Sequence, residues 1–288
     1  LSDALESLVN IASGTFALIS LKIASRPSDK NHPYGHGKIE FISGFVEGTL
    51  IIIAGLMMIG KATYNIIYPN EIKELFLGIL LTSVTGLVNF VMGFKLKKQG
   101  QKKGSMIMIS EGSHLMSDGY TSLALIVGIG VVWLSGFVVL DNVVSILFGL
   151  YVLYMGSKIF RKSIAGIMDE MDMDLVDEFI GDLNQERKAE WIDVHNLRII
   201  KFGRDVHIDC HLTLPWYYTL EKSHEQVELF EQVIKRKFEP HTEFFIHVDP
   251  CVESSCRLCL ISDCKVRMHP FEKKVEWGMD NVLENSKH

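Results

Sequence analysis

Long apolar stretches fill the first 160 residues of this chain and set the strongest limit on its fold. A helix that crosses the hydrocarbon core of a bilayer needs about 20 mainly apolar residues. Five segments meet this requirement, at about 2–24, 40–67, 74–94, 106–134 and 138–158. The mean hydropathy of +0.19 is also higher than a soluble enzyme of 288 residues usually reaches. We therefore predict an α-helical transmembrane bundle.

Basic residues between these segments indicate which side of the membrane each connection occupies. Cytoplasmic connections of membrane proteins are enriched in Lys and Arg. Three basic clusters alternate with connections near 68–70 and 135–136 that are poor in basic residues. The region after residue 160 is therefore expected in the cytoplasm, with the chain beginning on the outer side. No signal peptide precedes this outer start, so we expect one further span upstream, six in the full protein. The clusters are Arg26, Lys30 and Lys38; Lys95, Lys97, Lys98, Lys102 and Lys103; and Lys158, Arg161 and Lys162.

The composition changes near Asp169, and residues 169–250 resemble an ordinary soluble domain. Helical and strand patterns follow one another in the order αββαβ, with strands at about 192–202, 206–214 and 242–249. This order suits a small antiparallel sheet with helices on one face. We predict a transmembrane domain at 1–168, a cytoplasmic domain at 169–250 and a tail at 251–288. The net charge of −6 argues against a nucleic-acid partner.

Polar residues inside the apolar segments are the first candidates for function, because charged groups in a bilayer usually mark a transport path. The fourth segment contains Glu111, His114 and Asp118. His114 and Asp118 are four residues apart and share one helical face, as do Glu6 and Asn10 in the first segment. These nitrogen and oxygen ligands suit a divalent metal ion. The alternative is a satisfied His–Asp pair with no ion. Three other polar residues lack a partner at such spacing, and we expect structural or water-lined roles for them: Glu47, Asn89 and Asp141.

The connection after the first segment contains a second group of ligand-type residues, Asp29, His32 and His36. A proline and two glycines close to them permit a tight fold, which would let the three side chains converge on an ion. A solvated turn without metal is the alternative.

In the soluble domain, strand alternation gathers ligand-type side chains on few surfaces. His207, Asp209 and His211 are expected on one face, with Val206 and the other apolar residues of that strand on the opposite face. His247 and Asp249 share a face at the end of the last strand. An exposed polar surface that binds nothing is the alternative.

The tail carries four of the five cysteines, at Cys251, Cys256, Cys259 and Cys264. Four thiols within 14 residues could close a tetrahedral zinc or iron site, and the central CxxC spacing is common among metal ligands. Reduced cysteines that bind no metal are the alternative. The odd total suits a reducing compartment, and we expect no transport role for the tail.

At these residues the chain resembles the cation diffusion facilitator family of metal/proton antiporters, which includes the bacterial-type iron/zinc efflux pumps. The resemblance combines the paired polar residues of two spans, the loop ending His36-Gly37-Lys38, and the sequence His247-Val248-Asp249-Pro250. It covers residues 1 to about 250. It implies a homodimer of six-span protomers, a ferredoxin-like cytoplasmic domain, and a transport site between the family's second and fifth helices.

Carried over by position, the resemblance implies three metal sites and one contact between protomers. The transport site would be Glu6, Asn10, His114 and Asp118, and the loop site Asp29, His32 and His36. The cytoplasmic site would be His195, His211, His224, His247 and Asp249, and Lys38 with Asp169 would form a charge interlock. Well-known zinc exporters of the family carry Asp or His where Glu6 and Asn10 stand. Zinc is the expected ion, although iron or manganese would tolerate this oxygen-rich set.

The resemblance and the buried ligands together predict proton-coupled efflux of a divalent metal across a bacterial inner membrane. Imidazole and carboxylates bind metal in their deprotonated forms, so protons and metal compete for one site. The expected partners of this protein are a second copy of the chain, metal cations, protons and lipid. One alternative is an intramembrane metalloenzyme, although the chain contains no HExxH motif. Another is a metal sensor that its spans merely anchor.

Overall fold

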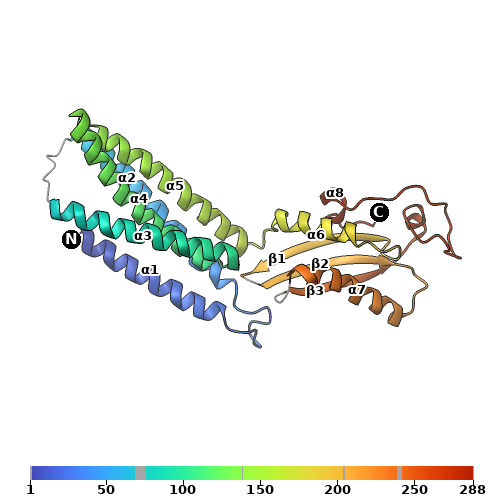
Figure 1. Cartoon of the computed structure of the whole chain (residues 1–288). Coiled ribbons are helices and arrows are strands. Elements are labelled where there is room, and N and C mark those ends of the chain that lie inside the picture. Colours follow the sequence, from blue (N-terminus) through green and yellow to red (C-terminus); the bar gives the residue numbers. More distant parts are fainter. Residues whose placement is uncertain (1, 69–75, 138, 204, 239–241, 288) are drawn as a thin grey trace. The chain divides into compact units, whose positions relative to one another are not determined.

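The computed structural model describes residues 2–68, 76–137, 139–203, 205–238 and 242–287. Side chains are described for a smaller set, which also leaves out residues 2–10, 76–81 and 236–238. The chain divides into two compact units, Leu1–Met168 and Asp169–His288. In the described residues, the regular secondary structure of the first unit is helical, and the second unit combines helices with a small sheet (Figure 1).

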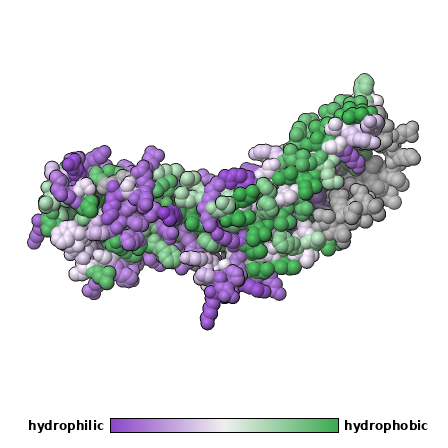
Figure 2. All heavy atoms as spheres, turned by 180° about the vertical axis from the view of Figure 1, so that it is seen from behind, coloured by the Kyte–Doolittle hydropathy of each residue, from purple (hydrophilic) through white to green (hydrophobic). Residues whose placement is uncertain are grey.

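The first unit contains five helices that begin within two residues of the predicted segments. In the described residues, three of them are long and apolar enough to cross a membrane, namely α2, α4 and α5, and Ile11–Ala24 of α1 forms a shorter apolar helix. Apolar side chains cover most of the face of this unit that Figure 2 shows, as contact with lipid requires. The helices are α1 (Ser2–Ala24), α2 (Ile39–Ile67), α3 (Phe76–Lys103), α4 (Met106–Ser135) and α5 (Val139–Ile167).

Helices α3 and α5 continue through the basic clusters beyond the predicted apolar spans. Helix α3 runs to Lys103 and α5 to Ile167, about nine residues past the ends of those spans. Lys and Arg are good helix formers, and α3 ends only where Gly104 adopts a φ of +66°. A helix of 28 residues is about 42 Å long, whereas the hydrocarbon core is about 30 Å thick. The basic residues therefore occupy final turns that extend beyond the hydrocarbon.

Glycines let the membrane helices pack closely in two pairs. Between α2 and α5, a Cβ atom added at Gly48 would lie 2.8 Å from the backbone nitrogen of Phe160. Between α3 and α4, a Cβ atom at Gly93 would lie 2.6 Å from the carbonyl oxygen of Gly112. Small residues at such positions allow helix backbones in a membrane to approach closely. Helices α2 and α4 thus belong to different pairs.

A buried carboxylate connects the start of α2 to the start of α4. Glu40 is 2% exposed, and its Oε2 atom accepts hydrogen bonds from the Ser105 hydroxyl at 2.9 Å and the Met106 amide at 2.6 Å. The first amides of a helix have no partner within that helix, and its N-terminus favours an anion. Glu40 thereby satisfies the N-terminus of α4 and fixes it against α2.

The second unit has the predicted αββαβ order, followed by the tail. Strand order in the sheet is β1-β2-β3. Strands β1 and β2 are antiparallel, but β2 and β3 are parallel, which corrects the prediction of an antiparallel sheet. Helix α7 connects β2 to β3 as a crossover, and a crossover of this kind produces parallel pairing. The elements are α6 (Met173–Gln185), β1 (Asp193–Phe202), β2 (Asp205–Leu214), α7 (Leu220–Phe238) and β3 (Thr242–Pro250).

The core of the second unit lies between the helices and one face of the sheet. Ile208, Cys210 and Leu212 of β2 are buried there with Phe179 of α6 and Phe230 of α7. Side chains alternate along a strand, so the intervening residues of β2 occupy the other face. The predicted alternation is confirmed, and it places the histidines of β2 on the face opposite this core.

The tail belongs to this unit, because its last part packs into the same core. Trp277 and Val282 are 3% and 0% exposed. The Asn184 side chain of α6 donates to the Trp277 carbonyl oxygen at 2.7 Å and accepts from the Trp277 amide at 3.2 Å. The Arg187 guanidinium lies 4.0 Å from the centre of the Trp277 ring. The tail includes a 3-10 helix at Glu253–Arg257 and the short helix α8 at Met279–Val282.

Candidate metal sites

Buried polar residues of α2 and α4 form the candidate site in the membrane unit. His114 of α4 is 7% exposed and Glu47 of α2 is 0% exposed. The His114 Nδ1 atom lies 2.9 Å from Glu47 Oε2, and its Nε2 atom lies 4.0 Å from Asp118 Oδ2. The imidazole therefore stands between two carboxylates, with Asp118 one helical turn along α4 as predicted.

Glu47 has no partner at i,i+4 spacing in the sequence and was expected to have a structural or water-lined role, yet the structure places it 2.9 Å from His114. Besides its contact with His114, its Oε1 atom accepts a hydrogen bond of 2.6 Å from the Ser13 hydroxyl of α1. The sequence held one signal, an acidic residue in an apolar span, which by itself marks a functional candidate. Its partners lie on other helices, and a periodicity argument within one helix does not find them.

Glu111 adds a third carboxylate to this group. Its side chain lies within electrostatic range of Glu47, His114 and Asp118. The group therefore combines one imidazole with three carboxyl groups, and its negative charge favours a cation or protons.

The two α1 residues predicted for this site, Glu6 and Asn10, have side chains outside the described residues. Their part in the site stays a prediction. The neighbouring turn of α1 does face the site, since Ser13 contacts Glu47 and a Cβ atom at Gly14 would lie 3.7 Å from Glu111 Oε1.

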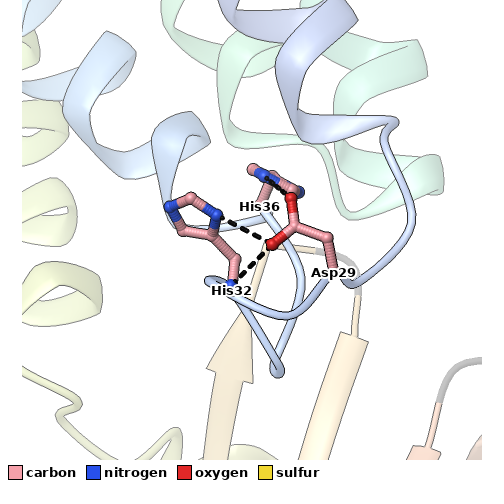
Figure 3. A group of neighbouring side chains, drawn as sticks. All are labelled: Asp29, His32 and His36. Atoms are coloured by element: carbon pink, nitrogen blue, oxygen red, sulfur yellow. Dashed lines mark hydrogen bonds and ion pairs between the residues drawn. The ribbon is translucent and has the colours of Figure 1, made fainter.

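The connection between α1 and α2 brings together the three residues predicted for the loop site (Figure 3). Asp29 Oδ1 lies 3.2 Å from His32 Nδ1, and Asp29 Oδ2 lies 3.5 Å from His36 Nε2. One ligand atom from each residue lies within 4.8 Å of the other two. The carboxylate stands between the two imidazoles, an arrangement that a divalent ion could occupy.

Backbone hydrogen bonds hold the Asp29 carboxylate in place. The amides of His32 and Asn31 both donate to its Oδ1 atom at 2.8 Å. These two amides, that of His32 first, lower the pKa of Asp29 below its usual value and keep the group ionised. Gly35 has a φ of +80°, which allows the chain to turn between the two histidines. The group is thus ready to bind a cation.

The sheet of the second unit aligns three histidines in one row. His195 of β1 pairs with His211 of β2, which pairs with His247 of β3. Asp249 lies at the centre of the group, with its Oδ2 atom 3.2 Å from His195 Nε2 and 3.0 Å from His211 Nδ1. His247 Nε2 is 3.6 Å from Asp249 Oδ1. Ligand atoms of His195, His211 and Asp249 all lie within 4.8 Å of one another.

The charges of this group suit metal binding. Burial lowers the pKa of His195 below its usual value, so the imidazole is neutral at pH 7, the form that binds metal. Burial alone would raise the pKa of Asp249, but hydrogen bonds from His211 and Lys287 outweigh this effect and lower it. An ionised carboxylate and a neutral imidazole are the states in which both groups act as ligands.

One predicted residue lies outside this site, and one residue that was not predicted contacts it. The predicted residue is His224 of α7, which is largely exposed and lies 3.5 Å from Glu228. Within this chain it is not part of the histidine group. Lys287 of the tail was not predicted, yet its Nζ atom lies 3.3 Å from Asp249 Oδ1. Nothing in the sequence pattern indicates a contact between residues so far apart in the chain.

The predicted interlock residues, Lys38 and Asp169, belong to different compact units, and their contact between protomers stays a prediction. Lys38 directly precedes α2, and Asp169 adopts a φ of +57° at the start of the second unit.

The four tail cysteines line one cavity of about 160 Å³. All of them are free thiols. Burial raises the pKa of Cys251 and of Cys259, so both are protonated at pH 7 in the absence of a cation. The fold thus brings together the residues that the CxxC spacing singled out.

Comparison with known families assigns both units. The family model of the cation efflux transmembrane domain matches residues 1–168. The family model of the cation efflux protein cytoplasmic domain, whose short name refers to a dimer, matches residues 174–251. Residues 252–288 lie beyond both matches.

Individual relatives agree with these matches. An uncharacterized transporter of Synechocystis sp. is 28% identical over 272 residues, which cover 94% of this chain and 84% of the relative. The cation-efflux pump FieF of Citrobacter koseri is 26% identical over 261 residues, covering 87% of this chain and 83% of the pump. The FieF of an Escherichia coli strain is 24% identical with the same coverage.

Proposed function

As a member of the cation diffusion facilitator family, this chain is a cation-efflux transporter of a membrane and not an enzyme, and from this premise we propose that it exports a divalent transition-metal ion in exchange for protons. The observation that carries the proposal is the buried group on α2 and α4, with His114 between Glu47 and Asp118. Such groups are costly in a bilayer and mark transport paths. Nitrogen and oxygen donors of this kind suit zinc first, with iron or manganese as alternatives.

Exchange follows from the protonation chemistry of the ligands. Metal binding requires a neutral imidazole and ionised carboxylates, so a bound ion displaces protons from His114 and the carboxyl groups around it. When the site faces the cytoplasm, a metal ion binds and protons leave. When it faces the outer side, protons bind and the metal ion leaves. Each cycle therefore moves metal out and protons in.

Helix α1 would supply the remaining ligands, Glu6 and Asn10. Helical periodicity places residue 10 on the same face as Ser13 and Gly14, which lie beside Glu47 and Glu111. Residue 6 follows on that face one turn earlier. Asn10 cannot titrate, so it would tune the affinity of the site without carrying a proton.

We place the transporter in a bacterial inner membrane as a homodimer, with the second unit in the cytoplasm. The bacterial relatives and the dimerisation name of the matched cytoplasmic domain support this placement. A dimer would also give His224 a role. Although it lies outside the histidine row of its own chain, it could bind an ion together with ligands of the partner subunit. The loop and sheet groups would then hold cytoplasmic ions that favour one state of the dimer.

Transport by the reconstituted wild-type chain tests the proposal. Proteoliposomes that contain a pH-sensitive dye should show proton movement on addition of zinc, opposite in direction to metal movement measured with a zinc dye. Competition by ferrous iron and manganese then ranks the three ions. Metal binding without any flux would favour a sensor, and metal-dependent cleavage of membrane peptides would favour an intramembrane metalloenzyme.

Asp249→Asn is expected to remove one bound ion per chain from the cytoplasmic site. Asparagine keeps the size of the side chain but loses the charge that contacts both His195 and His211. Loss of a charged ligand should weaken binding by at least about a hundredfold, the upper end of what loss of an outer-shell partner costs. Calorimetric titration of the full chain with zinc measures the stoichiometry. The matched control is Asp263→Asn in the tail loop, and an unchanged stoichiometry in Asp249→Asn would refute this site.

Lys287→Ala is expected to have the opposite effect on the same site. The Lys287 ammonium lies 3.3 Å from Asp249 and competes with a metal ion for its carboxylate. An ion pair of this partly exposed kind contributes up to about 1 kcal/mol, so its removal should raise zinc affinity about two- to fivefold. Calorimetry at low salt measures the change. Lys265→Ala is the control, and equal affinities in wild type and Lys287→Ala would show that the lysine does not compete.

A further inference from the structure

We propose that Cys251, Cys256, Cys259 and Cys264 form a closed tetrathiolate site for one zinc ion, structural and separate from transport. The four side chains line a single cavity of about 160 Å³ next to the end of β3. Three of them lie beyond residue 251, where the match to the cytoplasmic domain ends. Most of the site therefore lies outside the residues that the two family models match.

Three of the four sulfur atoms accept a hydrogen bond from a nearby donor. Donors of this kind orient the ligands and offset the negative charge that accumulates on thiolates around a metal ion. Two of the three are backbone amides, whose positions the fold fixes. The donors are the Trp216 amide to Cys251 at 3.4 Å, the Met268 amide to Cys256 at 3.5 Å, and the Tyr217 hydroxyl to Cys264 at 3.8 Å.

One arginine shapes the loop that carries three of the cysteines. The Arg267 guanidinium donates to the carbonyl oxygens of Cys256 at 2.6 Å, Cys259 at 3.0 Å and Ile261 at 2.6 Å. These bonds hold the turn around the CxxC sequence without any metal. A ligand set that the chain already holds close together loses less conformational entropy when the ion binds.

Four thiolates in a tetrahedral arrangement suit zinc. Structural zinc sites of the Cys₄ type have Zn–S distances of about 2.3 Å. In the described residues, the groups whose ligand atoms all lie within 4.8 Å are those of the loop and the sheet. The sulfur atoms are thus farther apart here than in a metal-bound site, and zinc would draw them inward. Free thiols in a reducing compartment remain available for this step.

A zinc ion at this place would fasten the tail to the sheet. Cys251 follows β3 directly, and its neighbours Trp216 and Tyr217 follow β2. The other three ligands belong to the loop that leads to Trp277 in the core and to Lys287 beside Asp249. Because four thiolates complete the coordination shell, no position remains for exchange, so the ion is not cargo.

Cobalt substitution of the full chain in detergent tests the proposal. Co²⁺ bound by thiolates gives charge-transfer absorption in the near ultraviolet, and tetrahedral Co²⁺ gives strong visible bands. All five cysteines lie in the second unit, and four of them are in the cluster, so nitrogen and oxygen ligands elsewhere add no thiolate absorption. We expect thiolate charge-transfer absorption that saturates with one Co²⁺ per chain in this cluster, whatever Co²⁺ the nitrogen and oxygen sites bind, and loss of this absorption when excess zinc is added.

The variant Cys256→Ser/Cys259→Ser should lose the charge-transfer signal and bind one zinc ion fewer per chain by elemental analysis. Cys210→Ala removes the fifth thiol, which is buried in the core, and should keep both. Absence of thiolate absorption in the wild type would overturn the proposal, as would rapid reaction of all four thiols with a thiol reagent after zinc loading. None of these results depends on metal flux, so failure of the transport proposal would leave them unaffected.

Discussion

His114→Ala is expected to reduce metal-driven proton flux in proteoliposomes to the level of vesicles without protein. The substitution removes the imidazole that joins Glu47 to Asp118 and leaves three carboxyl groups close together without their nitrogen ligand. Three ionised carboxylates repel one another, and protonation relieves this repulsion. In the ionised and in the protonated state alike, the group binds a transition metal poorly. Asp118→Ala should have the same effect, because it removes a charged ligand on the same face of α4.

The controls for this experiment separate loss of the site from loss of the fold. His269→Ala removes a partly exposed histidine whose contact is Glu253 in the tail, and it should transport like the wild type. Size-exclusion chromatography should show that His114→Ala and Asp118→Ala keep the oligomeric state of the wild type. Wild-type flux in both variants would remove these residues from the transport site.

Glu47→Gln is expected to lower the same flux by at least about a hundredfold. The glutamine can still accept from Ser13 but lacks the charge that faces His114 at 2.9 Å. Removal of one partner from a buried charged pair costs about 3 kcal/mol or more, and this corresponds to about two orders of magnitude in binding. Initial rates over a range of zinc concentrations would show whether the loss falls on affinity or on turnover.

Glu253→Gln, on the exposed part of the tail, is the matched control and should have no effect. The double variant Glu47→Gln/His114→Ala should be no worse than His114→Ala alone, since the two groups act on one ion. Normal flux in Glu47→Gln would return Glu47 to the purely structural role that the sequence suggested.

The sequence predicted those features that depend on local pattern. Apolar length located the five described helices of the first unit, three of which are long and apolar enough to cross a membrane, and alternation in β2 assigned Ile208, Cys210 and Leu212 to the core. The i,i+4 spacing placed His114 and Asp118 on one helical face. In each case, the prediction needed only residues that are neighbours along one helix or strand.

The features that were missed depend on contacts between distant parts of the chain. The partner of Glu47 lies on α4, 67 residues later by number, and the partner of Asp249 is Lys287 near the end of the tail. The parallel pairing of β2 and β3 follows from the path of α7 rather than from the strands themselves.

Because the three histidines lie on three different strands, metal binding at this site depends on the correct register of the sheet. Neighbouring side chains of a strand point to opposite faces, so a slip of β3 by one residue would turn His247 and Asp249 toward the helices and expose Phe244 and Ile246. A molecule with a misaligned sheet would thus lose its ion and its apolar core together. Zinc retention after refolding would therefore count the molecules whose strands are in native register.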